Sequence, residues 1–207
     1  MRKILKILAG LMLVIAIVTA IIFLMTERGV FEREPIGVEE LREAKEAGGE
    51  RWLRNQVAWL KIDGTHINYP IMQGSDNDYY LSHDYYGNKS ASGAIFLDFR
   101  NSDDFLDELS IVYGHRMNGD LMFSDVAKFR DEAYLLTHSK GELETRNGEY
   151  SLKVVEYRTI NSKDELYKSL SLGDPTEATI ILSTCDRSNH DVRDLLLLAF
   201  DNRGELW

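Results

Sequence analysis

TIILSTCDRSNHDVRDLLLLAF, residues Thr179 to Phe200, is the stretch that decides the fold of this chain. It begins with an apolar, β-branched run, passes through a polar segment and ends in a second apolar run. This pattern predicts a strand, a turn and a second strand. Cys185 would then lie where a buried strand ends, with Arg193 beside it on the antiparallel neighbour. A thiol beside a guanidinium suits nucleophilic catalysis, but free cysteines are also common as small core residues, so both interpretations stay open at this point.

The composition indicates a globular domain with an appendage. The chain has 207 residues, of which 44% are hydrophobic and 28% charged, and this excludes the disordered and fibrous classes. The formal net charge is −10; residues 1–28 carry +3, which leaves −13 on the remainder. Such an acidic domain repels nucleic acid and anionic lipid surfaces, so we expect no nucleic-acid partner.

The N-terminal region has the pattern of a membrane anchor. Ile7 to Met25 is a run of 19 residues without a charge, which as a helix matches the hydrocarbon thickness of a bilayer. Arg2, Lys3 and Lys6 precede it and favour a cytoplasmic N-terminus with an exported C-terminal domain. The run is longer than the apolar core of a cleaved signal peptide, so we expect a single-pass protein of the cell membrane. The expected organisation is a cytoplasmic tip and transmembrane anchor over residues 1–28, a linker over 29–37 and an extracellular domain over 38–207.

Export changes the interpretation of the cysteine. Cys185 is the only cysteine of the chain, whereas exported domains normally use cysteines in disulfide pairs. An unpaired thiol outside the cell is a liability to oxidation unless its chemistry is needed. Export therefore favours a nucleophilic role for Cys185 over a core role.

The rest of the chain predicts a mostly β domain. A helical segment, continuous or broken near Gly48-Gly49, is expected from Val38 to about Gln56, followed by a hairpin of Val57–Asp63 with His66–Met72. Further strands are expected over Ala94–Phe99, Leu109–Tyr113, Tyr134–Thr137, Glu142–Thr145 and Tyr150–Thr159, with Asn147-Gly148 predicting a hairpin between the last two. Short helices are expected over Tyr79–Leu81, Leu121–Phe129 and Asn161–Leu170. About eight short strands with a few peripheral helices favour a closed β-barrel, which leaves few open edges.

A cysteine nucleophile needs a group that handles protons, and histidine suits that task. His115 ends an apolar strand and follows Gly114, so a rigid scaffold would hold it at a rim, although a capped turn histidine would have the same local pattern. The other four histidines are expected to face solvent or a loop: His66, His83, His138 and His190.

A permanent positive donor would complete the site, either at a developing oxyanion or on the substrate backbone. Arg193 begins the second strand and is favoured over Arg187, which falls in the connection. One cysteine and no pair of histidines at ligand spacing give no metal signature, and neither a metal nor another cofactor is expected.

These motifs carry a family resemblance. Ile181-Leu182-Ser183-Thr184-Cys185, followed by Arg193, resembles the TLxTC segment and downstream arginine of sortases, the cysteine transpeptidases of Gram-positive cell surfaces. Val112-Tyr113-Gly114-His115 is similar to the histidine motif of that family. Three segments resemble class B sortases in particular, namely Asn68–Gly74, Asp76–Leu81 and Gly93–Phe99. The similarity extends over about residues 38–200; Ile181 stands where the family often has threonine, and the segment 161–174 is shorter than in some members.

The resemblance implies an eight-stranded sortase barrel and a mechanism. Cys185 would attack a carbonyl in the C-terminal sorting signal of a secreted surface protein and form a thioacyl enzyme. His115 would protonate the leaving amine, and Arg193 would hold the substrate or the oxyanion. The acyl group would then pass to an amine of a peptidoglycan cross-bridge or a pilin. The resemblance also suggests residues that line the substrate groove: Asn77, Leu81, Ser183 and Thr184.

Two alternatives and one chemical question stay open in the sequence. The chain could be a secreted cysteine peptidase with water as acceptor, or a surface binding module without catalysis in which Cys185 is buried. The pair of Cys185 and His115 could rest as neutral groups or as an ion pair, because their titrations would be coupled.

Overall fold

The computed structural model describes residues 10–20, 38–47, 52–171, 179–185 and 191–201, with Cys185 described by its backbone alone. The chain forms two units, Met1–Arg33 and Glu34–Trp207, and each is considered by itself. In the first unit, residues 10–20 are helical and exposed. They form the centre of the predicted span Ile7–Met25, whose two ends lie outside the described residues. Among the described residues, no helix has both the length and the hydropathy needed to cross a bilayer.

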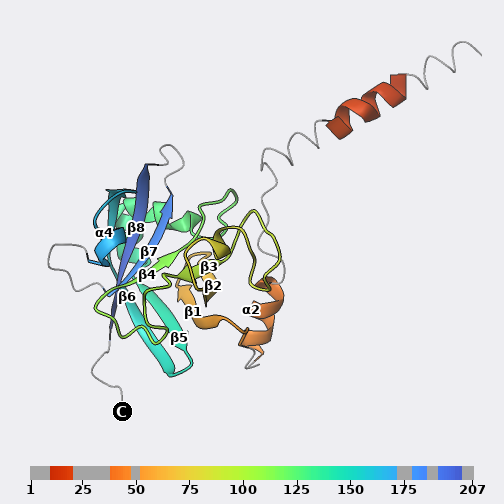
Figure 1. Cartoon of the computed structure of the whole chain (residues 1–207). Helices are drawn as coiled ribbons and strands as arrows, with labels where there is room; N and C mark the ends of the chain where they lie inside the picture. The colour runs from red at the N-terminus through yellow and green to blue at the C-terminus, as the bar shows by residue number, and fades with distance from the viewer. Residues whose placement is uncertain (1–9, 21–37, 48–51, 172–178, 186–190, 202–207) are drawn as a thin grey trace, which may run out of the picture. The chain divides into compact units, whose positions relative to one another are not determined.

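The second unit is a closed eight-stranded barrel (Figure 1). Around the barrel, the strands follow the order β1-β2-β3-β4-β7-β8-β6-β5. The pairs β2·β3 and β4·β7 are parallel, and the other neighbours are antiparallel. The strands are β1 (Gln56–Ile62), β2 (Asn68–Gln73), β3 (Ile95–Leu97), β4 (Ser110–Tyr113), β5 (Lys140–Thr145), β6 (Gly148–Asn161), β7 (Ile180–Cys185) and β8 (Val192–Phe200). The predicted mostly β fold and closed barrel are confirmed.

Both predicted hairpins are present. β1 pairs with β2 across a turn in which Gly64 has φ +74°, and β5 pairs with β6 across Asn147-Gly148, where Gly148 has φ +151°. A residue without a Cβ adopts these angles without steric cost. The Asn-Gly pair thus joins the two strands as the sequence predicts.

The helices are short and peripheral. They are α2 (Val38–Glu46), η1 (Tyr79–Leu81), η2 (Ser124–Arg130), α3 (Glu132–Thr137) and α4 (Leu166–Ser169). α2 ends at Glu46, residues 52–55 are not helical and Gln56 begins β1, so the predicted helical segment is wrong over residues 52–56. The remaining part of the gap between them, residues 48–51, lies outside the described residues.

Two other predicted elements need correction. The strand predicted over Tyr134–Thr137 is the helix α3, because the Asp131 side chain accepts the N–H of Ala133 as an N-cap and starts a helical turn. The helix predicted from Asn161 begins only at Leu166. Asn161 is the last residue of β6, and its side chain accepts the N–H of Lys163, so the intervening residues form a turn.

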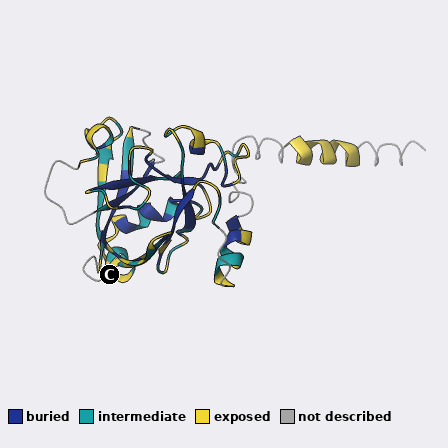
Figure 2. Cartoon of the chain, turned by 60° about the horizontal axis from the view of Figure 1, so that its bottom comes forward, coloured by how far each residue is buried: buried dark blue, intermediate teal, exposed yellow. Residues whose placement is uncertain are grey.

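The barrel is covered on both faces along β4, β7 and β8. On β8, Leu196 and Leu198 belong to the main core inside the barrel, whereas Leu195 and Leu197 pack with Leu166 of α4 in a second buried cluster. Figure 2 shows the buried strands inside a more exposed shell. A strand buried on both faces has a continuous apolar sequence, which explains the run of four leucines.

Candidate active site

Three neighbouring strands bring the predicted catalytic positions to one end of the barrel (Figure 1). β4 runs parallel to β7, with Tyr113 opposite Ser183. The N–H of Gly114 donates to Ser183 O at 3.2 Å and extends this pairing by one residue, so His115 follows directly. β8 runs antiparallel to β7, with Cys185 opposite Arg193. The predicted pairing of Cys185 with Arg193 is therefore confirmed at the level of the backbone.

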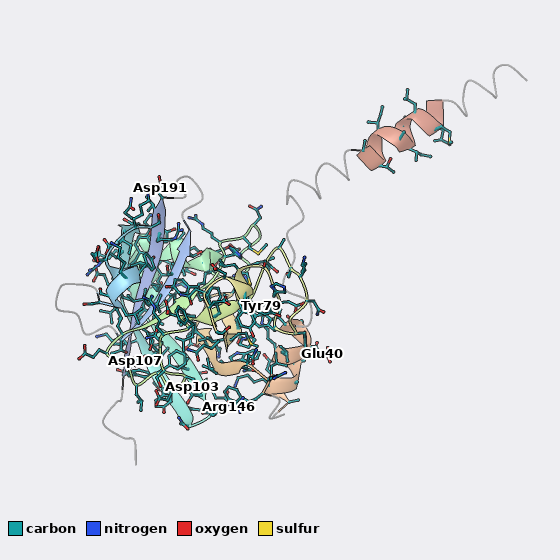
Figure 3. All side chains as sticks on the ribbon, in the orientation of Figure 1. Glu40, Tyr79, Asp103, Asp107, Arg146 and Asp191 are labelled. Carbon is teal, nitrogen blue, oxygen red and sulfur yellow. The ribbon has the colours of Figure 1, made fainter. Side chains whose placement is uncertain are left out.

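This end of the barrel lies opposite the hairpin turn between β5 and β6. Figure 3 labels Asp191, the residue before β8, and Arg146, in the β5–β6 turn, and the two lie far apart at opposite ends of the domain. The candidate site thus occupies the end at which β4 and β7 finish and β8 begins.

Gly114 gives the chain the space that it needs before His115. A Cβ at this position would overlap Ile95 Cδ1 and the ring of Phe123, both of which are buried core atoms. The carbonyl of His115 then accepts the N–H of Phe123 at 3.0 Å. The backbone on both sides of the histidine is therefore fixed by the core.

The imidazole of His115 is held by the loop that contains η1. Its Nε2 lies 2.8 Å from Leu81 O. A carbonyl oxygen only accepts, so Nε2 carries a hydrogen, and Nδ1 is the nitrogen that can gain or lose a proton. The loop itself is stabilised by Asp76, whose Oδ1 accepts the N–H groups of Asp78 and Tyr79 at 2.9 and 2.8 Å.

A cavity of about 260 Å³ lies at this end of the barrel. It brings together six of the seven predicted site residues, namely Asn77, Leu81, His115, Ser183, Thr184 and Arg193. The seventh predicted site residue, Cys185, is described by its backbone alone. The cavity is also lined by Phe96, Tyr113, Gly114, Ser162 and Tyr167. Its walls therefore come from β3, β4, β7, β8, the η1 loop and α4.

One wall of the cavity is organised by a buried carboxylate, Asp98. Its Oδ2 accepts Asn77 Nδ2 and Tyr113 OH, each at 2.9 Å, so it fixes two side chains that line the cavity. Arg100 donates to both carboxylate oxygens at 2.8 Å. Burial raises the pKa of Asp98, but the hydrogen bonds from Arg100, Asn77 and Tyr113 outweigh burial and hold that pKa below its usual 3.8. Asp98 is therefore a stable anion behind the cavity.

Arg100 also attaches α4 to this wall. Its guanidinium donates to the carbonyls of Tyr167 and Lys168 at 2.9 and 3.0 Å. Tyr167 OH in turn lies 2.8 Å from Ser183 Oγ. The carboxylate of Asp98 thus supports the η1 loop, the end of β4 and α4 together.

Thr184 contributes to the wall of the cavity, but its side chain lies on the same face of β7 as the core residue Leu182. It is buried, and within the described part of the chain its hydroxyl has no hydrogen-bond partner.

The other histidines lie elsewhere. His83 stacks on Tyr79 and His138 on Tyr134, and neither lines the cavity. His66 faces solvent, as predicted, but its Nδ1 also lies 3.0 Å from the buried Asp125. His190 and Arg187 lie outside the described residues.

Within the described ranges of the chain, one cluster has the geometry of a metal site, and it consists of His66, Asp120 and Asp125. The ammonium group of Lys128 already pairs with Asp125 at 2.7 Å and with Asp120 at 3.2 Å. A cation would have to compete with this lysine. The cluster therefore gives no reason to assign a metal.

Sequence reasoning missed Tyr113, Tyr167 and Asp98. Asp98 did carry a signal, since an acidic residue inside an apolar strand must have a partner when it is buried. Tyr113 lies directly before the Gly-His motif, at the same strand end. Tyr167 had no comparable signal, because its position depends on where α4 packs.

The comparisons agree with this geometry. Residues 60–197 match the sortase domain family, and the chain belongs to the sortase family. Sortase B of Listeria monocytogenes is 42% identical over 101 residues, which cover 49% of this chain and 41% of that protein. The matched stretch spans less than half the length of each curated relative.

The solved structures narrow the class within the family. Clostridium perfringens sortase B matches with a TM-score of 0.60 at 27% identity, over 70% of this chain and 93% of that one. A Staphylococcus aureus sortase B–substrate complex matches with a TM-score of 0.60 at 25% identity, over 86% and 89%. The resemblance to class B sortases inferred from the sequence is confirmed.

Proposed function

We propose that this protein is a membrane-anchored cysteine transpeptidase. It cleaves the C-terminal sorting signal of a secreted protein and transfers the acyl group to an amine of the cell wall or of a pilin. The observation that carries the proposal is the strand register, in which Cys185 pairs with Arg193 on a strand whose parallel neighbour leads into His115. A cavity lined by His115 and Arg193 lies at this place.

The first half-reaction uses the thiolate of Cys185. Its sulfur adds to the carbonyl carbon of the scissile peptide, and Arg193 donates hydrogen bonds to the oxyanion or to the substrate backbone. The C–N bond then breaks, and His115 gives the proton on Nδ1 to the leaving amine. The product is a thioester between Cys185 and the N-terminal part of the substrate.

The second half-reaction reverses these roles. An incoming amine attacks the thioester carbonyl and loses a proton to Nδ1 of His115, and the Cys185 thiolate leaves. The contact of Nε2 with Leu81 O supports this assignment, because it keeps the other nitrogen available. Asn77, Leu81, Ser183 and Thr184 would line the groove for the sorting peptide.

The anchor is proposed from the sequence. Residues 7–25 are uncharged, basic residues precede them, and residues 10–20 are helical. A single span with a cytoplasmic N-terminus would place residues 38–207 outside the cell, where secreted proteins and wall amines are found.

Product analysis tests the proposal. The full-length protein is incubated with a library of sorting-signal peptides, with and without a glycine peptide as amine acceptor. We expect cleavage and an amide product that contains the acceptor. Hydrolysis alone in both samples would make the protein a peptidase, and the absence of any cleavage would leave a binding module.

Variants assign the roles. Cys185→Ala is expected to abolish cleavage without unfolding the domain, and His115→Ala and Arg193→Ala are expected to lose about a hundredfold or more in turnover. His190→Ala and Arg187→Ala are the matched controls and should retain activity. The reverse ranking would transfer the roles to the residues of the connection.

A further inference from the structure

A second buried carboxylate, Asp194, lies directly beside Arg193 on β8. It is fully buried, and three described residues donate hydrogen bonds to it. Arg116 Nη1 donates to Oδ2 at 3.0 Å, Arg130 Nη2 donates to Oδ1 at 2.9 Å, and Tyr157 OH donates to Oδ1 at 2.6 Å. Both oxygens of the carboxylate are therefore engaged.

Asp194 does not face the substrate cavity. Successive residues of a strand point to opposite faces, and Asp194 shares its face with the core residues Leu196 and Leu198. Arg193 shares the other face with Leu195, and it lines the cavity whereas Asp194 does not. An effect of Asp194 on the reaction must therefore pass through its neighbours.

Asp194 and its partner Arg116 lie close, in sequence or in strand register, to the three residues proposed to act in catalysis. Arg116 follows His115, Asp194 follows Arg193, and Asp194 is the register partner of Thr184, which precedes Cys185. β7 lies between β4 and β8, so the contact from Arg116 to Asp194 reaches across the strand that carries the cysteine. The span from β4 to β8 is about 10 Å, twice the strand spacing.

We propose that Asp194 is a positioning residue and that its ion pair with Arg116 holds His115 in register with Cys185 and Arg193. The proposal rests on the proposed transpeptidase function for its activity readout. The pair acts from outside the substrate cavity, with Asp194 fully buried and the Arg116 side chain 21% exposed. Among the described residues, loss of the pair would leave His115 held by the contact of its Nε2 with Leu81 O and by its backbone hydrogen bond.

Arg130 provides a matched comparison. It binds the same carboxylate, but it ends η2 and adjoins none of the three proposed catalytic residues. Its side chain is 54% exposed, against 21% for Arg116. If the carboxylate mattered only for stability, loss of either arginine would affect the reaction to the same extent.

The experiment compares Arg116→Gln with Arg130→Gln in the full-length protein, with urea unfolding to measure the stability of each. We expect Arg116→Gln to lower kcat by about 10- to 100-fold with KM little changed, because a small displacement of a catalytic group costs this much. Arg130→Gln should leave both constants close to those of the unaltered protein. Asp194→Asn should resemble Arg116→Gln. The double variant that combines Arg116→Gln with Asp194→Asn should be no slower than the slower of these two single variants.

A second readout does not require peptide cleavage. Cys185 is the only cysteine, so the pH dependence of alkylation by iodoacetamide reports on this thiol alone. We expect the apparent pKa of the thiol to rise in Arg116→Gln and to stay unchanged in Arg130→Gln, because a displaced imidazole stabilises the thiolate less.

The outcomes separate the two proposals. Equal effects of Arg116→Gln and Arg130→Gln on kcat and on alkylation, or additive losses in the double variant, would overturn the positioning role. If the unaltered protein cleaves no peptide, the transpeptidase proposal fails, and the alkylation comparison still decides the role of Asp194.

Discussion

Asp98→Asn is the substitution with the most clearly determined consequence. The carboxylate is fully buried and accepts five hydrogen bonds, from Arg100 Nε, Nη2 and backbone N–H, from Asn77 Nδ2 and from Tyr113 OH. Asparagine has nearly the same shape but carries an NH₂ group in place of one oxygen. In either orientation of the amide, this NH₂ group faces hydrogen-bond donors. Two donors point at the Oδ1 position and three at the Oδ2 position.

The size of the effect follows from these contacts. Removing one charge of a buried ion pair costs about 3–5 kcal/mol, and the partial exposure of Arg100 puts this case near 3 kcal/mol in the free energy of unfolding at pH 7. For a domain of this size, the loss corresponds to a fall in Tm of about 6–12 °C. The displaced Asn77 and Tyr113 should also raise KM for the peptide.

The pH dependence has a defined sign. The folded-state pKa of Asp98 lies below its usual 3.8, so the carboxylate contributes stability above that value and loses it as the pH falls through the folded-state pKa. The difference in stability between the unaltered protein and Asp98→Asn should therefore shrink below about pH 4.

Urea unfolding of the full-length protein in mild detergent, followed by tryptophan fluorescence at pH 7 and at low pH, measures this difference. Asp103→Asn is the matched control, because it removes the same charge from an exposed position on the neighbouring loop, labelled in Figure 3. The control should change the stability by less than about 0.5 kcal/mol. A loss below about 1 kcal/mol for Asp98→Asn at pH 7, or a difference that grows toward low pH, would refute the reasoning.

Three further substitutions test other parts of the structure. Gly114→Ala should destabilise the domain by about 1–3 kcal/mol and lower kcat, because the added methyl overlaps Ile95 and Phe123 next to His115; an unchanged melting temperature and rate would contradict this. Burial and the hydrogen bond to Asp194 raise the pKa of Tyr157 to about 12, from 10.0, so the unaltered protein should lose stability as the pH rises through 10 to 12, and Tyr157→Phe should show less of this loss in alkaline unfolding curves. Tyr167→Phe removes the bond to Ser183 and should raise KM more than it lowers kcat, as steady-state kinetics with a cleavable peptide would show.

The parts of the fold that the sequence predicted are those with local causes. The second apolar run, residues 195–200, indicated the strand β8, and the Asn-Gly pair indicated the β5–β6 hairpin. Cys185 and Arg193 belong to consecutive strands, so their pairing followed from an antiparallel connection. These features need no knowledge of distant segments.

The parts that the sequence did not predict depend on distant contacts. The apolar residues Tyr134 and Leu135 fit a strand or a helix equally well, and the N-cap by Asp131 decided for α3. Asp98 and Asp194 were not recognised as supports of the site, because their partners Arg100, Arg116 and Arg130 gain meaning only once the strands are placed. His115 lies beside β7 through a parallel pairing between segments about 70 residues apart, and only the family resemblance suggested this contact.

Intact mass spectrometry after incubation with the sorting-signal peptides tests the central claim most directly. We predict an adduct with the mass of the N-terminal peptide fragment on the unaltered protein, its release by hydroxylamine as expected of a thioester, and its absence in Cys185→Ala. An adduct that persists in Cys185→Ala, or peptide cleavage by that variant at the normal rate, would contradict the account.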